Sequence, residues 1–194
     1  MILFGARTRG DTKPLAKALM RHFGSLAAVL AGAPERLAEV PGAASPAVWA
    51  ALALSREAAA RLARAEVMGR PVIASRQALL DYCQIAMGET PVEQFRILFL
   101  DRKNALVADE LQQQGTVDHT PVYPREVLKR ALALGASALI MVHNHSSGDP
   151  TPSRVDIEMT KQIRDAAKAV GIGLHDHLVI GRGRHASFKS LGLI

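Results

Sequence analysis

Residues 138–156 read Ala-Leu-Ile-Met-Val-His-Asn-His-Ser-Ser-Gly-Asp-Pro-Thr-Pro-Ser-Arg-Val-Asp and are the most informative part of the chain. The apolar run 138–142 is short and predicts a buried strand. His143 and His145 follow at its end, and side chains two apart on an extended strand point to the same side. The stretch therefore predicts a sheet that presents two imidazoles at the end of one strand.

A predicted helix follows this strand after a turn, and it offers a carboxylate. Ser153 and Asp156 are three residues apart at its start, so their side chains share one helix face. Together with His143 and His145, Asp156 can supply three ligands to one metal ion, as in catalytic zinc sites that keep a fourth position open. From the spacing alone, a solvated loop around the turn-forming Ser147–Pro150 is an equally good interpretation.

The spacing of His-x-His, seven residues, Ser, two residues and Asp resembles the signature of the JAB/MPN metalloenzyme family, also called JAMM. Longer strings, His143–Pro150 with Val122–Val127 upstream and Asp176–Gly181 downstream, are similar to its bacterial RadC-like branch. The resemblance implies an α/β (α+β) fold in which helices flank a layered sheet.

The resemblance also implies one Zn²⁺ per chain, with three expected ligands: His143, His145 and Asp156. Zinc lowers the pKa of a bound water to about 7 and so provides a nucleophile at neutral pH. The implied activity is that of a zinc-dependent metallopeptidase or isopeptidase. Its substrate would be a peptide or protein, whose identity the sequence does not name.

Two further residues complete the implied active site. Glu110 is expected to be the general acid/base that moves a proton from the water to the leaving amine. Its neighbour Asp109 is expected to point the other way, because adjacent residues of an extended strand face opposite sides. Ser153 is expected to donate a hydrogen bond to the oxyanion, and the alternative is that it only caps the helix.

Ser146 is a departure from the family pattern, since RadC-like proteins usually have proline directly after the second histidine. Serine leaves all the expected ligands in place, so metal binding should survive, while the geometry of the loop is left open. His175 and His177 repeat the His-x-His spacing further along. His177 is expected either to orient a metal ligand from behind or to be a structural histidine of a strand.

The resemblance implies a JAB/MPN zinc metalloprotease-like domain over residues 72–194, and hydrophobic periodicity and turn residues predict the helices and strands within it. Ser75 is the expected N-cap of its first helix. The predicted helices are 75–82, 125–134 and 153–170. The predicted strands are 95–101, 106–112, 138–145 and 175–180, of which the first two form an antiparallel hairpin.

Residues 1–68 predict a small all-α module, since apolar residues recur there at helical spacing between Gly and Pro breaks. The segment 39–45, Glu-Val-Pro-Gly-Ala-Ala-Ser, resembles the helix-hairpin-helix module, in which small residues let the backbone approach DNA phosphates. Ala44 replaces the second glycine of that pattern. A helical packing module without DNA contact is therefore the alternative.

Charge is uneven along the 194 residues. Residues 1–70 contain ten Lys/Arg and five Asp/Glu, whereas the remainder is nearly balanced. A basic module suggests an anionic partner, DNA first, and the alternative is a solvated arginine-rich surface. The second functional hypothesis is thus a DNA-associated repair or recombination accessory protein, with the JAB domain as a binding module. An inactive scaffold is the third, against which the intact set of site residues argues.

Composition excludes several other classes of protein. Cys83 is the single cysteine, which rules out internal disulfides, multi-cysteine zinc sites and the zinc deaminases. The absence of His-Glu-x-x-His excludes the thermolysin-like design. No apolar stretch is long enough for a membrane span and the start does not resemble a signal peptide, so a cytoplasmic location is expected. The oligomeric state is not indicated.

Overall fold

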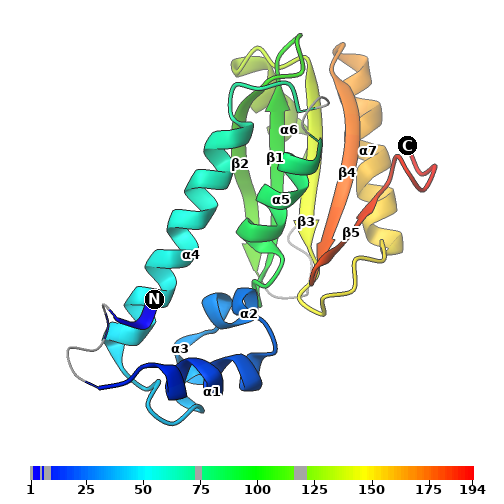
Figure 1. Cartoon of the computed structure of the whole chain (residues 1–194). Coiled ribbons are helices and arrows are strands. Elements are labelled where there is room, and N and C mark those ends of the chain that lie inside the picture. Colours follow the sequence, from blue (N-terminus) through cyan, green and yellow to red (C-terminus); the bar gives the residue numbers. More distant parts are fainter. Residues whose placement is uncertain (1, 5, 7–9, 73–75, 116–121) are drawn as a thin grey trace. The chain divides into compact units, whose positions relative to one another are not determined.

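The computed structural model describes residues 2–4, 6, 10–72, 76–115 and 122–194 (Figure 1). The chain divides into two compact units, Met1–Leu62 and Ala63–Ile194. The first is helical and the second is a mixed sheet with flanking helices, which confirms the expected fold class. The domain limits 1–68 and 72–194 stay a prediction. Among the described residues, no helix is both long and apolar enough to cross a membrane.

The helical unit contains a short 3-10 helix, η1 (Ile2–Phe4), and the α-helices α1 (Lys13–Phe23), α2 (Leu26–Ala31), α3 (Pro34–Ala38) and the first part of α4 (Pro46–Val67). Gly24 ends α1 with φ of 81°, a left-handed conformation that glycine adopts without a Cβ clash. Apolar side chains of all four helices share one core: Leu15, Leu19, Val29, Leu37, Val48 and Leu52. The helical module was predicted, while its likeness to a helix-hairpin-helix remains a prediction.

The second unit is organised on a five-stranded sheet in the order β2-β1-β3-β4-β5. The strands are β1 (Glu93–Leu100), β2 (Leu106–Gly115), β3 (Ala138–Asn144), β4 (Gly173–Gly181) and β5 (Arg184–Ser187). β1 pairs antiparallel with both β2 and β3, as β5 does with β4, whereas β3 and β4 are parallel. Helix α7 (Arg154–Ala169) makes the crossover that a parallel pair needs.

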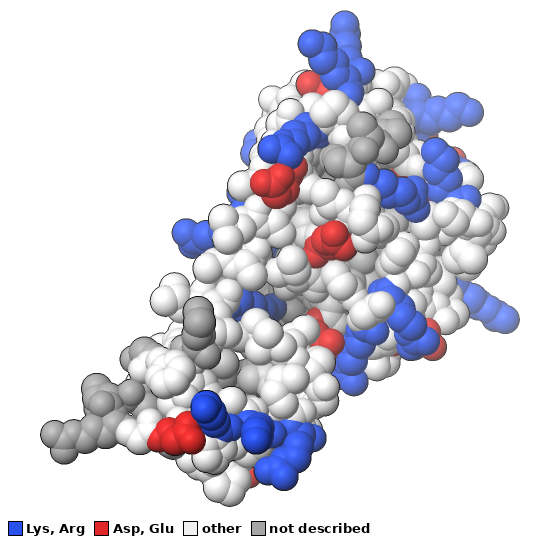
Figure 2. Space-filling model, in the orientation of Figure 1, with Lys and Arg blue, Asp and Glu red and all other residues white. Residues whose placement is uncertain are grey.

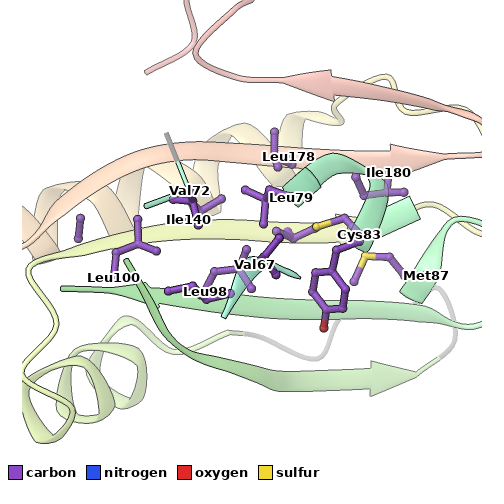
Figure 3. Packing of buried hydrophobic residues seen from close by; sticks show 14 residues of the cluster. Val67, Val72, Leu79, Cys83, Met87, Leu98, Leu100, Ile140, Leu178 and Ile180 are labelled. Atoms are coloured by element: carbon purple, nitrogen blue, oxygen red, sulfur yellow. The ribbon is translucent and has the colours of Figure 1, made fainter. Parts of the chain in front are cut away.

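Helices cover both faces of this sheet. On one face, α5 (Arg76–Met87) packs side chains such as Leu79 and Cys83 against Leu98 and Ile140 (Figure 3). On the other face, α6 (Pro124–Ala133) and α7 pack against the sheet through a second apolar cluster, which includes Val127, Ile163, Phe99 and Met141. All seven residues of β3 are buried, as expected for a central strand covered on both sides.

Alternation along β3 decides which face carries the site. Ile140 and Val142 belong to the cluster under α5, whereas Leu139 and Met141 belong to the cluster under α6 and α7. His143 continues the second series, so its ring lies on the α6–α7 face.

Some elements differ from the sequence prediction. β5 was missed because Arg-His-Ala-Ser has no apolar run; it forms as a short return strand after the turn at Gly183. α5 continues beyond the expected end at residue 82 to Met87, whose side chain is buried. β1 begins at Glu93, two residues earlier than expected, because its polar first residues pair with β2. The expected cap Ser75 lies outside the described residues.

Candidate metal centre

The three expected metal ligands converge at one place, between the end of β3 and the first turn of α7. Nε2 of His143 lies 3.0 Å from Nε2 of His145 and 3.4 Å from Oδ1 of Asp156. Nε2 of His145 lies 3.5 Å from Oδ2 of Asp156. Among the described residues, these three form the one group of His, Cys, Asp and Glu with metal-site spacing.

These distances match the size of a zinc site. Ligand atoms placed 2.0–2.1 Å from a tetrahedral zinc lie about 3.3–3.4 Å from each other. The observed 3.0, 3.4 and 3.5 Å spread around that value. The three side chains are also mostly shielded, with 8%, 18% and 13% of their surfaces exposed.

Hydrogen bonds on the far side of each imidazole orient it. Nδ1 of His145 lies 2.7 Å from the backbone carbonyl of Asp149, which can only accept, so Nδ1 carries the proton. Nδ1 of His143 lies 2.8 Å from Nε2 of His177, a buried histidine of β4. Both rings therefore turn Nε2 toward Asp156. The hydrogen bond with Asp156 raises the pKa of His145 despite partial burial.

Asp156 is held by the N-terminal turn of its own helix. Its Oδ2 accepts the backbone N–H and the hydroxyl of Ser153, both at 2.7 Å. Burial raises the pKa of Asp156, but contacts with His143, His145 and Ser153 outweigh that effect and hold the pKa far below its usual range. Since Oδ2 already has two donors, Oδ1 is the oxygen left for a metal ion.

The chemistry of this donor set fits a cation. Two imidazole nitrogens and two carboxylate oxygens approach within 3.0–3.5 Å of one another. Such a cluster of lone pairs is stable only when a proton or a metal ion lies between them. The residues present therefore fit zinc, as the sequence predicted.

Ser153 lies beside the cluster as the N-cap of α7. Its Oγ accepts the backbone N–H of Asp156 at 3.1 Å, and its own backbone N–H donates to the Asp156 carboxylate at 2.7 Å, which together form a capping box. The Ser153 hydroxyl also donates to this carboxylate. This is the capping role that the sequence left open. Its expected donation to an oxyanion stays a prediction.

Glu110 is further away than the sequence suggested. It pairs with Ile97, which pairs with Met141, so its side chain is on the correct face. Two strand spacings and two residues put its Cα about 12 Å from that of His143. Its carboxylate is held by Arg130 of α6, with a shortest contact of 2.6 Å. Glu110 is not part of the cluster of His143, His145 and Asp156, and its role as acid/base stays a prediction.

Asp109 points away from the site, as expected from strand alternation. It pairs with Leu98 and turns to the α5 face, where Tyr82 and Arg96 bind its carboxylate.

Glu93 is a carboxylate beside the centre that the sequence analysis missed. Phe95 pairs with His143 across β1 and β3, so Glu93 lies on the same face, opposite position 145 and one strand spacing away, about 5 Å. Its charge contributes to the raised pKa of His145. Only the register of β1 against β3 reveals this, because Glu93 precedes the apolar part of its strand.

Ser146 connects Glu93 to the loop after His145. Its backbone N–H and its hydroxyl both donate to Oε1 of Glu93 at 3.2 Å, and its carbonyl accepts from Arg182 at 3.3 Å. The same loop needs Gly181, because a Cβ there would lie 2.3 Å from the carbonyl oxygen of Gly148. Serine in place of proline thus adds two donors to a neighbouring carboxylate and leaves the ligands in position.

Comparisons with known proteins agree with these features. A family model described as RadC-like JAB domain matches residues 73–193. A curated protein of Rhodobacter capsulatus, named UPF0758 protein, is 62% identical over 194 residues, which cover all of this chain and 90% of that protein. The first match covers the sheet and the metal-binding cluster, and the second extends through the helical unit.

Proposed function

The chain belongs to the RadC-like JAB domain family, and from this premise we propose that it is a zinc-dependent hydrolase of the JAMM metallopeptidase type. The observation that carries the proposal is the convergence of His143, His145 and Asp156. The proposed substrate contains an amide or isopeptide bond in a peptide or protein.

His143, His145 and Oδ1 of Asp156 would hold the zinc ion. When bound, zinc supplies a Lewis acid and lowers the pKa of a water to about 7. Three protein ligands leave a further position for the reactants, which separates a catalytic site from a structural one. The ligand side chains come from the end of β3, the residue after it and the first turn of α7, and their ligand atoms already lie within 4.8 Å of one another, so little reorganisation is needed for binding.

We assign the general base to Glu93 rather than Glu110. Glu93 lies one strand away, opposite position 145, and Ser146 holds its carboxylate there through two hydrogen bonds. Glu110 lies two strands away and is bound by Arg130. In this role, Glu93 takes a proton from the attacking water and gives it to the leaving amine.

Ser153 is proposed to have two roles. In the free protein its hydroxyl holds Oδ2 of Asp156, which leaves Oδ1 turned toward the imidazole of His143. Ser153 is an exposed residue beside the three proposed ligands, and in this proposal its hydroxyl rotates toward a substrate oxyanion. One such donor typically contributes about 3 kcal/mol to lowering the barrier.

The test combines metal analysis with hydrolysis of peptide and isopeptide substrates by the full chain. Asp156→Asn should lose both zinc and activity. Glu93→Gln should keep zinc and lose activity by about 10²–10⁴-fold, the usual contribution of a general acid/base. Glu110→Gln is the matched control and should retain most of the activity.

The alternatives are separated by the same measurements. Loss of activity in Glu110→Gln, with Glu93→Gln active, would return the base to Glu110. A wild-type protein that binds no zinc and is indifferent to added zinc would contradict the proposed hydrolase altogether.

A second candidate function, binding of DNA by the helical unit, is favoured by one observation. Lys13, Lys17 and Arg21 are exposed and recur every four residues, so they form a basic stripe along α1. Figure 2 shows Lys and Arg side chains gathered over this unit, with acidic groups beside them. Such a stripe suits a phosphate backbone.

DNA binding is tested by a salt titration of the full chain with duplex DNA. Phosphate contacts predict that the affinity falls steeply with salt, and that replacing Lys13, Lys17 and Arg21 by Gln flattens the slope. The matched control replaces Lys161, Arg164 and Lys168 of α7 in the same way. No binding at low salt would remove this candidate.

A further inference from the structure

His177 is buried directly behind His143. The parallel register pairs Met141 with His177, so His177 and His143 lie on the same face of neighbouring strands. His177 is 0% exposed, and its ring lies 5.8 Å from the ring of Phe95 and 4.5 Å from that of Phe188. Both of its ring nitrogens nevertheless have polar partners: Nε2 lies 2.8 Å from Nδ1 of His143, and Nδ1 lies 2.7 Å from Oγ1 of Thr160.

The direction of these hydrogen bonds follows from Thr160. Its Oγ1 lies 2.5 Å from the backbone carbonyl of Asp156, one helical turn earlier. A carbonyl oxygen can only accept, so the single hydroxyl proton of Thr160 must lie on that contact. The hydroxyl then has only lone pairs to offer to His177, and Nδ1 of His177 must carry a proton that it donates to Thr160.

The same reasoning assigns the protonated nitrogen of His177 and then that of His143. A neutral histidine with its proton on Nδ1 has a lone pair on Nε2, so His177 accepts from Nδ1 of His143. His143, with its proton on Nδ1, then has its own lone pair on Nε2. That nitrogen faces Asp156 at 3.4 Å and is the atom that would bind the metal.

We propose that Thr160 and His177 are positioning residues, which form a hydrogen-bond relay that fixes His143 in its metal-binding tautomer. The proposal rests on the proposed metal centre and adds two residues to it. The relay starts at the backbone carbonyl of Asp156 and ends at His143, so it links two of the three ligands through buried groups. His145 is fixed separately by the Asp149 carbonyl.

The relay also differs from the common arrangement in which a carboxylate accepts a hydrogen bond from a metal-binding histidine. A carboxylate behind a metal-binding histidine accepts a proton whatever its surroundings. His177 can accept only while Thr160 takes its other proton. The expected consequence is that a change at Thr160, which touches no metal ligand side chain, alters His143 through His177.

The first test reads the tautomers directly in the metal-free protein. Long-range ¹H–¹⁵N NMR of the ¹⁵N-histidine-labelled full chain at neutral pH should show His177 protonated on Nδ1 and unprotonated on Nε2, with His143 protonated on Nδ1. Thr160→Val should move the His177 proton toward Nε2. A wild-type His177 that carries its proton on Nε2 overturns the relay, and this measurement requires neither a variant nor a bound metal.

The second test measures zinc affinity by competition with a chromophoric chelator. Thr160→Val and His177→Phe should bind zinc about 10–100-fold more weakly, the usual effect of losing a partner behind a metal ligand. Thr160→Ser restores the hydroxyl and should bind like wild type. His175→Gln is the matched control, because His175 is on the same strand but bonds to Asn104 instead.

The outcomes separate the relay from the proposed function. Wild-type zinc affinity in a folded Thr160→Val variant would overturn the relay while leaving the metal centre intact. If the wild-type protein binds no zinc, the proposed function fails, and the NMR measurement still decides whether the relay exists. Equal losses in Thr160→Ser and Thr160→Val would point to packing rather than hydrogen bonding, and would also overturn it.

Discussion

Two shielded carboxylates, Asp109 and Asp156, belong to opposite faces of the same sheet, and their surroundings are opposite in kind. Asp109 is surrounded by donors: the hydroxyl of Tyr82, the guanidinium of Arg96 at 2.8 Å and that of Arg64 at 3.9 Å. Asp156 faces the Nε2 atoms of His143 and His145, at 3.4 Å and 3.5 Å, and neither ring carries a permanent charge. The first carboxylate is neutralised by guanidinium groups, whereas the second has only histidine partners, which carry a charge when protonated.

The comparison explains why burial alone does not identify a functional site. The Asp109 side chain is less exposed than that of Asp156, at 0% against 13%. Its fully satisfied network has the features of a structural element that closes the α5 face. What distinguishes Asp156 is that its partners are histidines rather than arginines, and each prediction tests this difference between the two carboxylates.

The largest expected effect on stability comes from breaking the ion pair between Asp109 and Arg96. Asp109→Leu leaves the Arg96 charge with only 20% of its side chain exposed and without its partner. Breaking such a pair typically costs about 3–5 kcal/mol. Chemical denaturation of the metal-free protein measures this cost. Glu110→Gln, the next residue on β2 and paired with a half-exposed arginine, should cost far less.

Zinc should stabilise the folded protein by binding to His143, His145 and Asp156. A ligand that binds only the folded protein raises its stability by about 2.7 kcal/mol when its free concentration is a hundredfold above the dissociation constant. The unfolding midpoint of the wild-type chain should rise accordingly with zinc and fall again with a chelator. Asp156→Asn should show no such rise. A zinc response of the same size in that variant would mean that the ion binds elsewhere.

Much of this arrangement could be predicted from sequence, and the reason lies in local patterns. The apolar run before His143 and the Ser153–Asp156 spacing are short-range signals, and they predicted β3 and α7. The choice of the three ligands over a solvated loop came from the family resemblance. The resemblance of those strings to a known family added the sheet. The opposite orientations of Asp109 and Glu110 followed from strand alternation alone.

The feature that was missed, Glu93, and the one that was left open, the place of His177, both depend on pairing between distant segments. Glu93 reaches the site only through the antiparallel register of β1 against β3, and His177 lies behind His143 only through the parallel register of β3 and β4. A local sequence pattern predicts neither of these strand registers. Glu110 was expected as the base from the family pattern, and its ion pair with Arg130 of α6 is a tertiary contact that no spacing along the chain indicates.

A smaller effect on stability is expected from a change at Ser146, which lies beside the proposed metal centre. Ser146→Ala removes the hydroxyl that binds Glu93 and keeps the backbone N–H that also binds it. Losing one such bond at a half-buried position costs about 1 kcal/mol. Zinc affinity should be unchanged, since no ligand is touched, while turnover should fall because Glu93 is less well held. Unchanged turnover with a measurable loss of stability would argue against Glu93 as the base.

The smallest effect concerns the labelling rate of Cys83, a buried thiol near Asp109. This rate reports whether the α5 face of the sheet stays covered. Burial, together with the charge of Asp109, raises the pKa of Cys83 to about 12, so the thiolate that reacts with labelling reagents is scarce at neutral pH. Thiol labelling of the native chain should therefore be slow and should accelerate on unfolding. Zinc binding stabilises the whole folded unit and should slow labelling further, whereas Asp156→Asn should abolish that dependence on zinc. Rapid labelling of the native wild-type protein would show that the α5 face opens without global unfolding. The difference between Asp109 and Asp156 would then be smaller than the hydrogen bonds of Asp109 imply.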